Sequence, residues 1–530
     1  MVDHRAFFKF DVARYHDAEL PPVRAAIRKG SRLCPAGKSR PEWFPLGIAV
    51  KRRKGRRGPT ERSALSGNRS TKLPRRANGR AIDLASRPPE LQTIAEFRAS
   101  RHRTFRRREE NGGRMRLLVY PHDLSIGGSQ INAIDLAAAV AAAGHEVAVY
   151  GIPGPLVSYI EERGLRFVPA RRLRYRPAPS RIAQLAAVAA RERIDLIHAY
   201  EWPSCLDAYY GAAAVLRVPL LCTVLSMSVM PQVPASVPLV MGTADLGDEA
   251  RAAHRGAVWV LEPPIDVERD HPGIDGEPFR RRHNVAPDEF LIVAVSRLAL
   301  DLKLDALVRA VDAADLLAAR RRIRLILVGD GPSREALDVR ARAVNARWSR
   351  EVVTLAGAEL DPRGAYAAAD LVLGMGSSAL RALAIGRPLI VQGERAFSEI
   401  FERETLGIFL RQGFYGLAND ERGAARLAGQ VDTLIDDPSR RDENAAFGRE
   451  LVVRRFSLER AVDIQLGIYR KLLATSPAIR PREALRSAWL ALKIEIDNHD
   501  PRRKRRLRRR EDRIFDSTRA GFWPPSFEGL

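Results

Sequence analysis

A glycine-cornered turn in the second half of the chain carries residues whose types and spacing suit phosphate binding. The stretch is typical of a short buried strand over 371–373, a Gly374-x-Gly376 turn, and a helix that begins at Ser377 and Ser378. The glycines let the backbone turn sharply and leave space for a ligand. A helix start presents unpaired N–H groups and the positive end of a dipole, which suit a phosphate. An ordinary strand-turn-helix corner is the alternative, because a Gly-x-Gly turn alone is a weak signal.

Alternating strand and helix patterns surround this turn and would position it. From 115 to about 270, apolar runs typical of buried strands alternate with helical patterns, and a second such block begins near 290. This alternation predicts parallel sheets that are covered by helices on both faces. We therefore expect an α/β fold of two Rossmann-like doubly wound domains that face a cleft, with the ligand in the cleft.

The predicted organisation has five parts, with a polar hinge over about 266–288 between the two blocks. The parts are a disordered basic extension over 1–114, an N-terminal domain over 115–270, a C-terminal domain over 280–456, a closing helix over 457–475 and a disordered basic tail over 476–530.

The net charge of +24 lies entirely in the flanks. Residues 1–114 hold 29 Lys and Arg against 11 Asp and Glu, and residues 476–530 hold 14 against 8, so residues 115–475 hold 45 of each sign. The charge therefore describes two tails and no basic binding face on a domain, and a nucleic-acid partner is not expected.

The character of the chain changes abruptly at Met115, after a flank without sustained periodicity. We expect Met115 to be the natural start, with 1–114 an upstream extension of the reading frame; the alternative is a basic arm that binds nucleic acid or anionic lipid. Cys34, Cys205 and Cys222 show no metal-ligand spacing and are expected to be reduced thiols in a cytoplasmic protein. No apolar run reaches the roughly 18 residues that a bilayer span requires, so we expect no integral membrane protein.

Six motifs in order resemble those of GT-B fold glycosyltransferases, most closely the retaining family-4 group (glycosyl transferases group 1). They are Gly-Gly-Ser at 127–129, Asp-Leu-Ile-His at 195–198, Glu-Pro-Pro-Ile-Asp at 262–266, Ser-Arg-Leu at 296–298 with a following Lys303, Val-Gly-Asp-Gly-Pro at 328–332, and Ala-Leu-Arg-Ala-Leu-Ala-Ile-Gly-Arg-Pro at 379–388. The resemblance covers about 115–475 and leaves both tails unexplained.

The resemblance implies a hexosyltransferase-type enzyme that moves a sugar from a nucleoside diphosphate donor to a glycan, glycolipid or small-molecule hydroxyl with retention. Arg297 and Lys303 would neutralise the charge that develops on the leaving diphosphate. Both could equally be solvated surface charges. The donor-binding set implied with them is Gly127, Gly128, Ser129, Gly329, Gly376, Ser377, Ser378, Arg381 and Glu394. No cofactor or metal is expected, because the two cations would supply the charge.

His198 and Glu201 are further candidates at the end of a predicted strand. At that edge His198 would contact acceptor or donor, although a strand-end His is often a hydrogen-bonded structural residue. Glu201 would bind a sugar hydroxyl or assist proton transfer, or it is a loop charge.

Two departures from the family pattern put turnover in doubt. Tyr200 stands where members often carry a second His, and Arg381 stands where a Glu is expected to hold the ribose hydroxyls. Arg381 cannot accept a hydrogen bond and would instead hold a phosphate. The earlier Glu of the family pair has no clear counterpart, although Glu394 or Glu399 could replace it in space. A GT-B protein that binds nucleotide or glycan without turnover therefore remains an alternative.

An NAD-dependent oxidoreductase is the other alternative. Gly374-x-Gly376-x-x-Ala379 follows a strand, opens a helix and precedes Glu394 by about the spacing of a dinucleotide fingerprint. Against it, the motif lies at the fourth strand of its block, whereas the fingerprint normally opens a block.

The tail combines a potential amphipathic helix over 481–496 with the basic run 502–510. Together they would give peripheral contact with the inner face of the plasma membrane, where a lipid-linked acceptor of the cell envelope would wait. The alternative is a helix that packs on the protein's own surface.

Overall fold

The computed structural model describes residues 113–172, 175–253, 256–300, 302–418, 423–475, 477 and 479–500. All of them belong to one compact unit, Leu84–Leu530. The predictions for residues 1–112 and for the basic run 502–510 lie outside the described residues.

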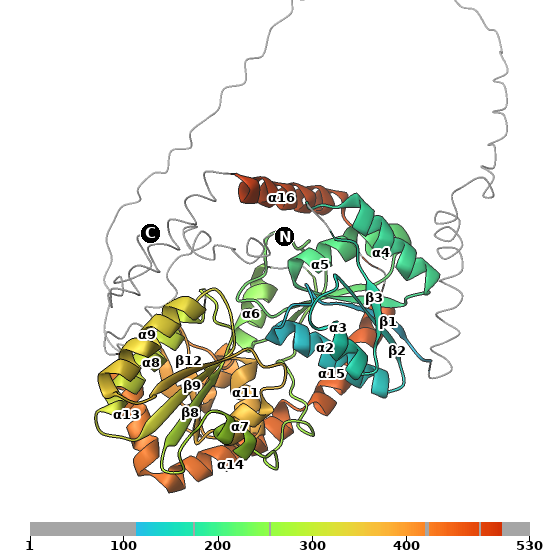
Figure 1. Cartoon of the computed structure of the whole chain (residues 1–530). Helices are drawn as coiled ribbons and strands as arrows, with labels where there is room; N and C mark the ends of the chain where they lie inside the picture. The colour runs from blue at the N-terminus through green and yellow to red at the C-terminus, as the bar shows by residue number, and fades with distance from the viewer. Residues whose placement is uncertain are drawn as a thin grey trace, which may run out of the picture. The chain divides into compact units, whose positions relative to one another are not determined.

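Seven parallel strands form the first sheet, in the order β3-β2-β1-β4-β5-β6-β7 (Figure 1). The strands are β1 (Arg116–Tyr120), β2 (Glu146–Gly151), β3 (Arg166–Pro169), β4 (Leu196–Tyr200), β5 (Leu220–Val224), β6 (Leu239–Met241) and β7 (Val258–Val260). The helices of this half are α2 (Gly128–Ala142), α3 (Val157–Glu162), α4 (Pro179–Arg191), α5 (Glu201–Ala208), the π-helix η4 (Tyr209–Leu216) and α6 (Ala244–Ala253). All residues of β4 and β5 are buried, as continuous apolar runs in a doubly covered sheet require.

The second sheet has six strands in the order β10-β9-β8-β11-β12-β13, and only its edge strand β13 runs antiparallel. The strands are β8 (Phe290–Val295), β9 (Ile323–Val328), β10 (Val353–Gly357), β11 (Leu371–Gly374), β12 (Leu389–Gln392) and β13 (Ser398–Ile400). The helices are α7 (Glu277–Arg282), α8 (Leu304–Ala318), α9 (Arg334–Trp348), α10 (Arg363–Ala368), α11 (Ser377–Ala384), α12 (Leu406–Gln412), α13 (Gly423–Asp436) and α14 (Pro438–Arg455). The predicted α/β fold with two Rossmann-like doubly wound sheets is confirmed.

The chain passes between the two halves twice, and the two passages pair. Ile265, which leaves the first half, forms a parallel bridge with Ser457, where the chain returns. The Ile265 N–H donates to the carbonyl of Phe456 at 2.8 Å, and the Leu458 N–H donates to the carbonyl of Ile265 at 2.9 Å. The predicted linker also contains α7, so only part of it is irregular.

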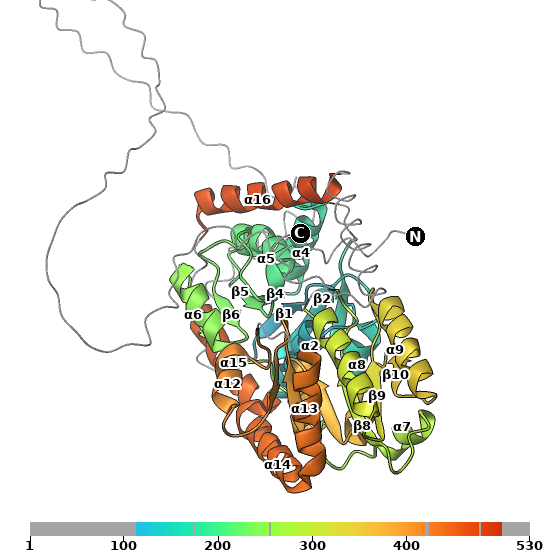
Figure 2. The same cartoon turned by 90° about the vertical axis from the view of Figure 1, so that its left-hand side faces the viewer.

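The last two helices pack on the first half of the chain. α15 (Leu458–Leu473) joins a core cluster with Met115 and Leu117, and α16 (Pro481–His499) lies near α4 and α5 (Figure 2). Among the described residues, no helix has the length and apolarity to cross a bilayer.

Candidate active site

The candidate loops follow the central strands of the two sheets. The winding direction reverses between β1 and β4 in the first sheet and between β8 and β11 in the second. Ligands of open α/β sheets bind beyond the carboxyl ends of the strands at such switch points. Gly128 and Glu201 follow β1 and β4, and Arg297 and Gly376 follow β8 and β11. The sequence motifs therefore lie where this fold class places its ligands.

The corner between β11 and α11 needs both of its glycines, for different reasons. Gly376 has φ +61° and ψ −129°, a conformation that side chains rarely adopt. A Cβ on Gly374 would lie 2.8 Å from the Cα of Ala379, so the helix packs directly against the strand end. The Ser378 hydroxyl donates to the carbonyl of Val295 at 2.8 Å. Ser378 therefore offers a ligand its backbone N–H, whereas its hydroxyl is already bonded inside the domain.

The glycine loop after β1 touches the tip of α11. A Cβ on Gly128 would lie 2.7 Å from the Ser377 hydroxyl oxygen, so the first residues of α2 and α11 are close neighbours. Ser129 lies in the first turn of α2, and Gly127 is its N-cap residue. Because the first turn of each helix leaves N–H groups without intrahelical partners, two positive helix ends converge at this place.

Asp123 holds the glycine loop, and the sequence gave no signal for it. Its carboxylate accepts hydrogen bonds from the Ser125 N–H at 2.8 Å and from the Ser125 hydroxyl, and it lies 2.8 Å from Nδ1 of His122. Burial alone would raise the pKa of Asp123, but these bonds with His122 and Ser125 hold it well below its usual range. The loop before α2 is therefore fixed by a permanently charged carboxylate.

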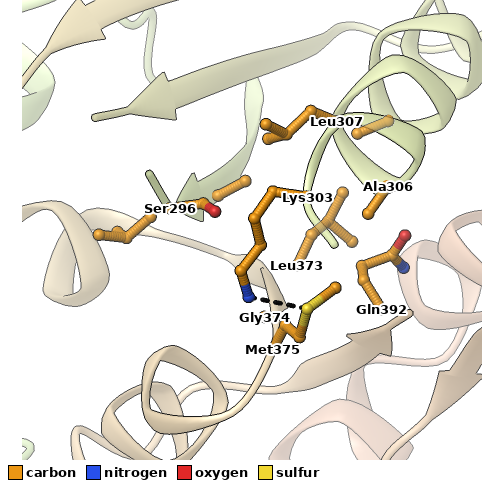
Figure 3. A pocket seen from close by; sticks show the side chains of 11 residues that line it. Ser296, Lys303, Ala306, Leu307, Leu373, Gly374, Met375 and Gln392 are labelled. Atoms are coloured by element: carbon orange, nitrogen blue, oxygen red, sulfur yellow. Dashed lines mark hydrogen bonds between the residues drawn. The ribbon is translucent and has the colours of Figure 1, made fainter. Parts of the chain in front are cut away.

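Lys303 points to the same corner from the second sheet. Its Nζ lies 2.8 Å from the sulfur of Met375, and it lines a cavity of about 30 Å³ together with Ser296 and Gly374 (Figure 3). Burial, helped by the nearby Arg297 charge, lowers the pKa of Lys303 to about 8. The cavity has room for a water molecule or two, so a donor would bind outside it.

Arg297 and Glu394 lie near this ammonium group. Arg297 is exposed, and its charge still acts on Lys303, so the structure brings the two predicted cations together. Glu394 acts on Lys303 in the opposite sense and accepts a hydrogen bond from the Tyr415 hydroxyl. The site thus contains two cations, one carboxylate and two helix ends.

Gly329 supports this site by close packing. A Cβ on Gly329 would meet the carbonyl oxygen of Ser296 at 1.9 Å. In the same turn, the Leu298 N–H donates to the carbonyl of Asp330 at 3.0 Å. The turn after β9 therefore shapes the segment that carries Arg297.

A buried arginine, absent from the sequence predictions, fixes the loop that carries Glu394. Arg309 in α8 donates to the carbonyl oxygens of Gly393 at 2.8 Å and Phe397 at 2.9 Å. Between these carbonyls, Arg395 and Ala396 have positive φ values of 50° and 65°. Two consecutive non-glycine residues in this region are strained, and the Arg309 bonds hold them there.

Arg381 pairs with carboxylates, so the prediction that it holds a phosphate needs correction. Its side chain lies 3.7 Å from Asp135 of α2 and 3.7 Å from Asp270. Arg163 also pairs with Asp135 at 3.1 Å, and the Tyr159 hydroxyl donates to Asp135 at 2.6 Å. Burial raises the pKa values of Asp135 and Asp270. Arg381 is therefore part of an ionic cluster that links α11 to α2.

His198 has a structural place in the fold, and its predicted contact with a substrate is corrected. Its Nδ1 lies 2.7 Å from the Tyr469 hydroxyl, and its Nε2 lies 2.6 Å from the Thr223 hydroxyl. Burial lowers the pKa of His198 to about 3. Because both ring nitrogens are bonded inside the protein, neither is available to a sugar or a phosphate.

Glu201 braces the loop after β5. Its carboxylate accepts hydrogen bonds from the N–H groups of Leu225 at 2.9 Å and Ser226 at 3.1 Å. Its own φ is +63°, so the turn from β4 into α5 is strained. Tyr200, directly before it, is buried beside His198, with ring centroids 4.6 Å apart. Neither side chain contacts the residues around Lys303 in any interaction described above.

The described cysteines and acids give no further site. Cys205 and Cys222 are free and buried. Within the described residues, no group of three or more His, Cys, Asp and Glu side chains is arranged to hold a metal ion.

Two family models match this chain, one in each half. The model described as Glycosyltransferase Family 4 matches residues 126–232, and the model described as Glycosyl transferases group 1 matches residues 289–437. The matches include the glycine loop before α2, Arg297, Lys303 and the α11 corner.

Curated proteins with similar sequences are also glycosyltransferases. Alpha-D-kanosaminyltransferase of Streptomyces kanamyceticus is 26% identical over 202 residues, which are 37% of this chain and 48% of that protein. D-inositol 3-phosphate glycosyltransferase of Rhodococcus erythropolis is 30% identical over 270 residues, which are 46% of this chain and 58% of that protein. The chain thus spans about half the length of these relatives.

Solved structures share the fold. A glycosyltransferase from Rickettsia africae superposes with a TM-score of 0.56 at 15% identity, covering 68% of this chain and 100% of that one. HepE from Anabaena, solved in complex with UDP, gives a TM-score of 0.53 at 18% identity, covering 67% and 100% of the two chains.

Proposed function

Because the chain belongs to the GT-B glycosyltransferases of family 4 and group 1, we propose that it moves a hexosyl group from a nucleoside diphosphate sugar to a hydroxyl acceptor with retention. The observation that carries the proposal is the convergence of Gly128, Ser377 and Lys303. The dinucleotide alternative is set aside, because both halves of the chain match glycosyltransferases.

The donor diphosphate binds where α2 and α11 begin. Backbone N–H groups of Gly128, Ser377 and Ser378 donate to its oxygens, since the helix ends favour a negative charge. HepE has been solved with UDP and with UDP-glucose, which supports a donor of this class. Gly127 and Ser129 set the loop, and Gly329 shapes the nucleotide side of the site.

The two cations act on the leaving group. As the bond between the anomeric carbon and the diphosphate breaks, negative charge grows on the phosphate oxygens, and Lys303 and Arg297 stabilise it. The acceptor hydroxyl attacks on the face that the diphosphate leaves, and a phosphate oxygen takes its proton. Glu394 keeps the Lys303 ammonium group oriented and is placed to accept a sugar hydroxyl.

Closure of the two halves limits hydrolysis of the donor. The paired passages at Ile265 and Ser457 provide a short hinge, while the Arg381–Asp135 pair joins α11 to α2. Excluding water strengthens the electrostatic interactions with the diphosphate. The acceptor is a glycan or a lipid-linked hydroxyl compound, bound on the first half of the chain.

A GT-B protein that binds donor without turnover is the second candidate, and Arg381 favours it. In place of a carboxylate that accepts from ribose, this position carries a cation that is already paired with Asp135 and Asp270. The two candidates differ only in turnover.

The test is release of nucleoside diphosphate by the full chain from a panel of UDP-, GDP- and ADP-sugars, with and without acceptors. We expect release with one donor and its loss in Lys303→Met, whereas Lys471→Met, an exposed lysine of α15, stays active. Proton NMR of the product gives the anomer, and retention is expected. Binding without release supports the second candidate, and a thermal shift with NAD but with no nucleoside diphosphate refutes the proposal.

A further inference from the structure

Helix α16 exposes a row of large apolar side chains although it is docked on the protein. Leu485, Trp489, Leu492 and Ile496 are 73%, 63%, 42% and 59% exposed. At 100° per residue these four lie within about 60° of arc, so they form one narrow stripe along the helix. We call them the α16 stripe.

The opposite face of α16 holds the helix against the first half of the chain. Ala491 and Ser487 are buried, and the Ser487 hydroxyl donates to the carbonyl of Gln232. The Tyr210 hydroxyl donates to the carbonyl of Ala484 at 2.7 Å (Figure 2). This docking by small residues fixes the rotation of the helix and turns the α16 stripe outward.

Cations accompany the stripe. Arg482, Arg486 and Lys493 are exposed, and on a helical wheel they follow the stripe along one side, between about 60° and 100° from Leu485. Directly after the helix, eight of the ten residues 501–510 are Lys or Arg. The whole stretch from 482 to 510 therefore combines an apolar edge with a strong positive charge.

We propose that the α16 stripe lies in the interface of an anionic lipid surface, with the cations beside and after it contacting the headgroups. An exposed apolar stripe with flanking cations is the pattern of interfacial helices, and none of the described helices crosses a bilayer. Charge selects the occupant: a protein partner for 482–510 would need a strongly acidic face, whereas an anionic bilayer supplies both negative charge and an apolar layer. The proposal goes beyond the proposed function and does not depend on it.

The test is co-sedimentation of the full chain with vesicles of phosphatidylcholine alone and of phosphatidylcholine with phosphatidylglycerol. We expect binding to the anionic vesicles only. Trp489→Gln with Ile496→Gln should weaken binding by at least about tenfold, because two apolar side chains no longer leave water. Leu316→Gln with Leu360→Gln, which removes two exposed leucines of the other half, should bind like the parent chain. Equal thermal unfolding of both variants shows that they are folded.

A second arm tests the charge. Replacing Arg502, Arg503 and Lys504 by Gln should weaken binding by about fivefold for each cation at low salt, and about 0.5 M NaCl should release the protein. Equal binding to both vesicle types, or binding that the stripe variant leaves unchanged, overturns the proposal. So does a dimer in sedimentation velocity that the stripe variant dissociates while vesicles stay unbound, because the stripe would then be an interface between copies.

Discussion

Nucleotide affinity should fall steeply between pH 7 and pH 9 if Lys303 holds the diphosphate. With a pKa of about 8 in the free protein, Lys303 is about 90% charged at pH 7 and about 10% charged at pH 9. A bound diphosphate raises this pKa, because a nearby opposite charge favours the ammonium form. The dissociation constant of UDP should therefore rise about tenfold over these two pH units. The diphosphate itself adds little, since its last ionisation lies near pH 6.

Isothermal titration calorimetry at constant ionic strength measures this effect. Lys303→Met should bind UDP weakly at both pH values and show no step, whereas Lys471→Met should keep the step. An affinity that does not change from pH 7 to pH 9, or a step that persists in Lys303→Met, would show that the diphosphate is bound away from Lys303.

Three further changes test the neighbouring parts of the account. Gly128→Ala places a Cβ 2.7 Å from the Ser377 hydroxyl oxygen, so UDP affinity should fall severalfold and recover in the double variant with Ser377→Ala; a titration without recovery contradicts that contact. Arg381→Met leaves two buried carboxylates without their cation and should lower the free energy of unfolding in urea by about 3–5 kcal/mol, and an unchanged midpoint would refute the ionic cluster. His198→Phe leaves the Tyr469 and Thr223 hydroxyls unpaired and should cost about 1–3 kcal/mol in the same assay while UDP affinity stays the same; lost affinity with full stability would return His198 to the site.

Lys303 also links stability to pH in a direction that can be checked. Its pKa in the folded protein lies below the usual value near 10.4, so the unfolded chain binds more protons between about pH 8 and pH 10.4. The contribution of this residue to stability therefore rises with pH across that window, by about 3 kcal/mol at most. Urea unfolding of Lys303→Met should lack this rise, and a parallel pH dependence in both proteins would contradict the buried position of the ammonium group.

Local patterns predicted the elements of this fold well. The turn at Gly374 and Gly376 was predicted as strand, turn and helix because the apolar run, the glycines and the Ser residues all act within a few positions of one another. Arg297 and Lys303 were likewise found from their place after a strand. These residues fall near each other because central strands of a doubly wound sheet end at one edge.

Long-range partners decided what the sequence could not. His198 lies at a strand end, as predicted, but its bond to Tyr469 joins residues 271 positions apart, and no local pattern announces it. Arg381 was expected to meet a phosphate, and its partner Asp135 lies on another helix in the other half of the chain. A lone acid in the apolar run of α2 was the signal that pointed to such a pair.

The measurement that tests the central claim most directly is a crystal structure of the full chain with UDP. The account predicts diphosphate oxygens within hydrogen-bond distance of the N–H groups of Gly128 and Ser377 and of the Lys303 ammonium group. A nucleotide bound elsewhere, with Arg297 and Lys303 directed away from it, would contradict the proposed sugar transfer at this site.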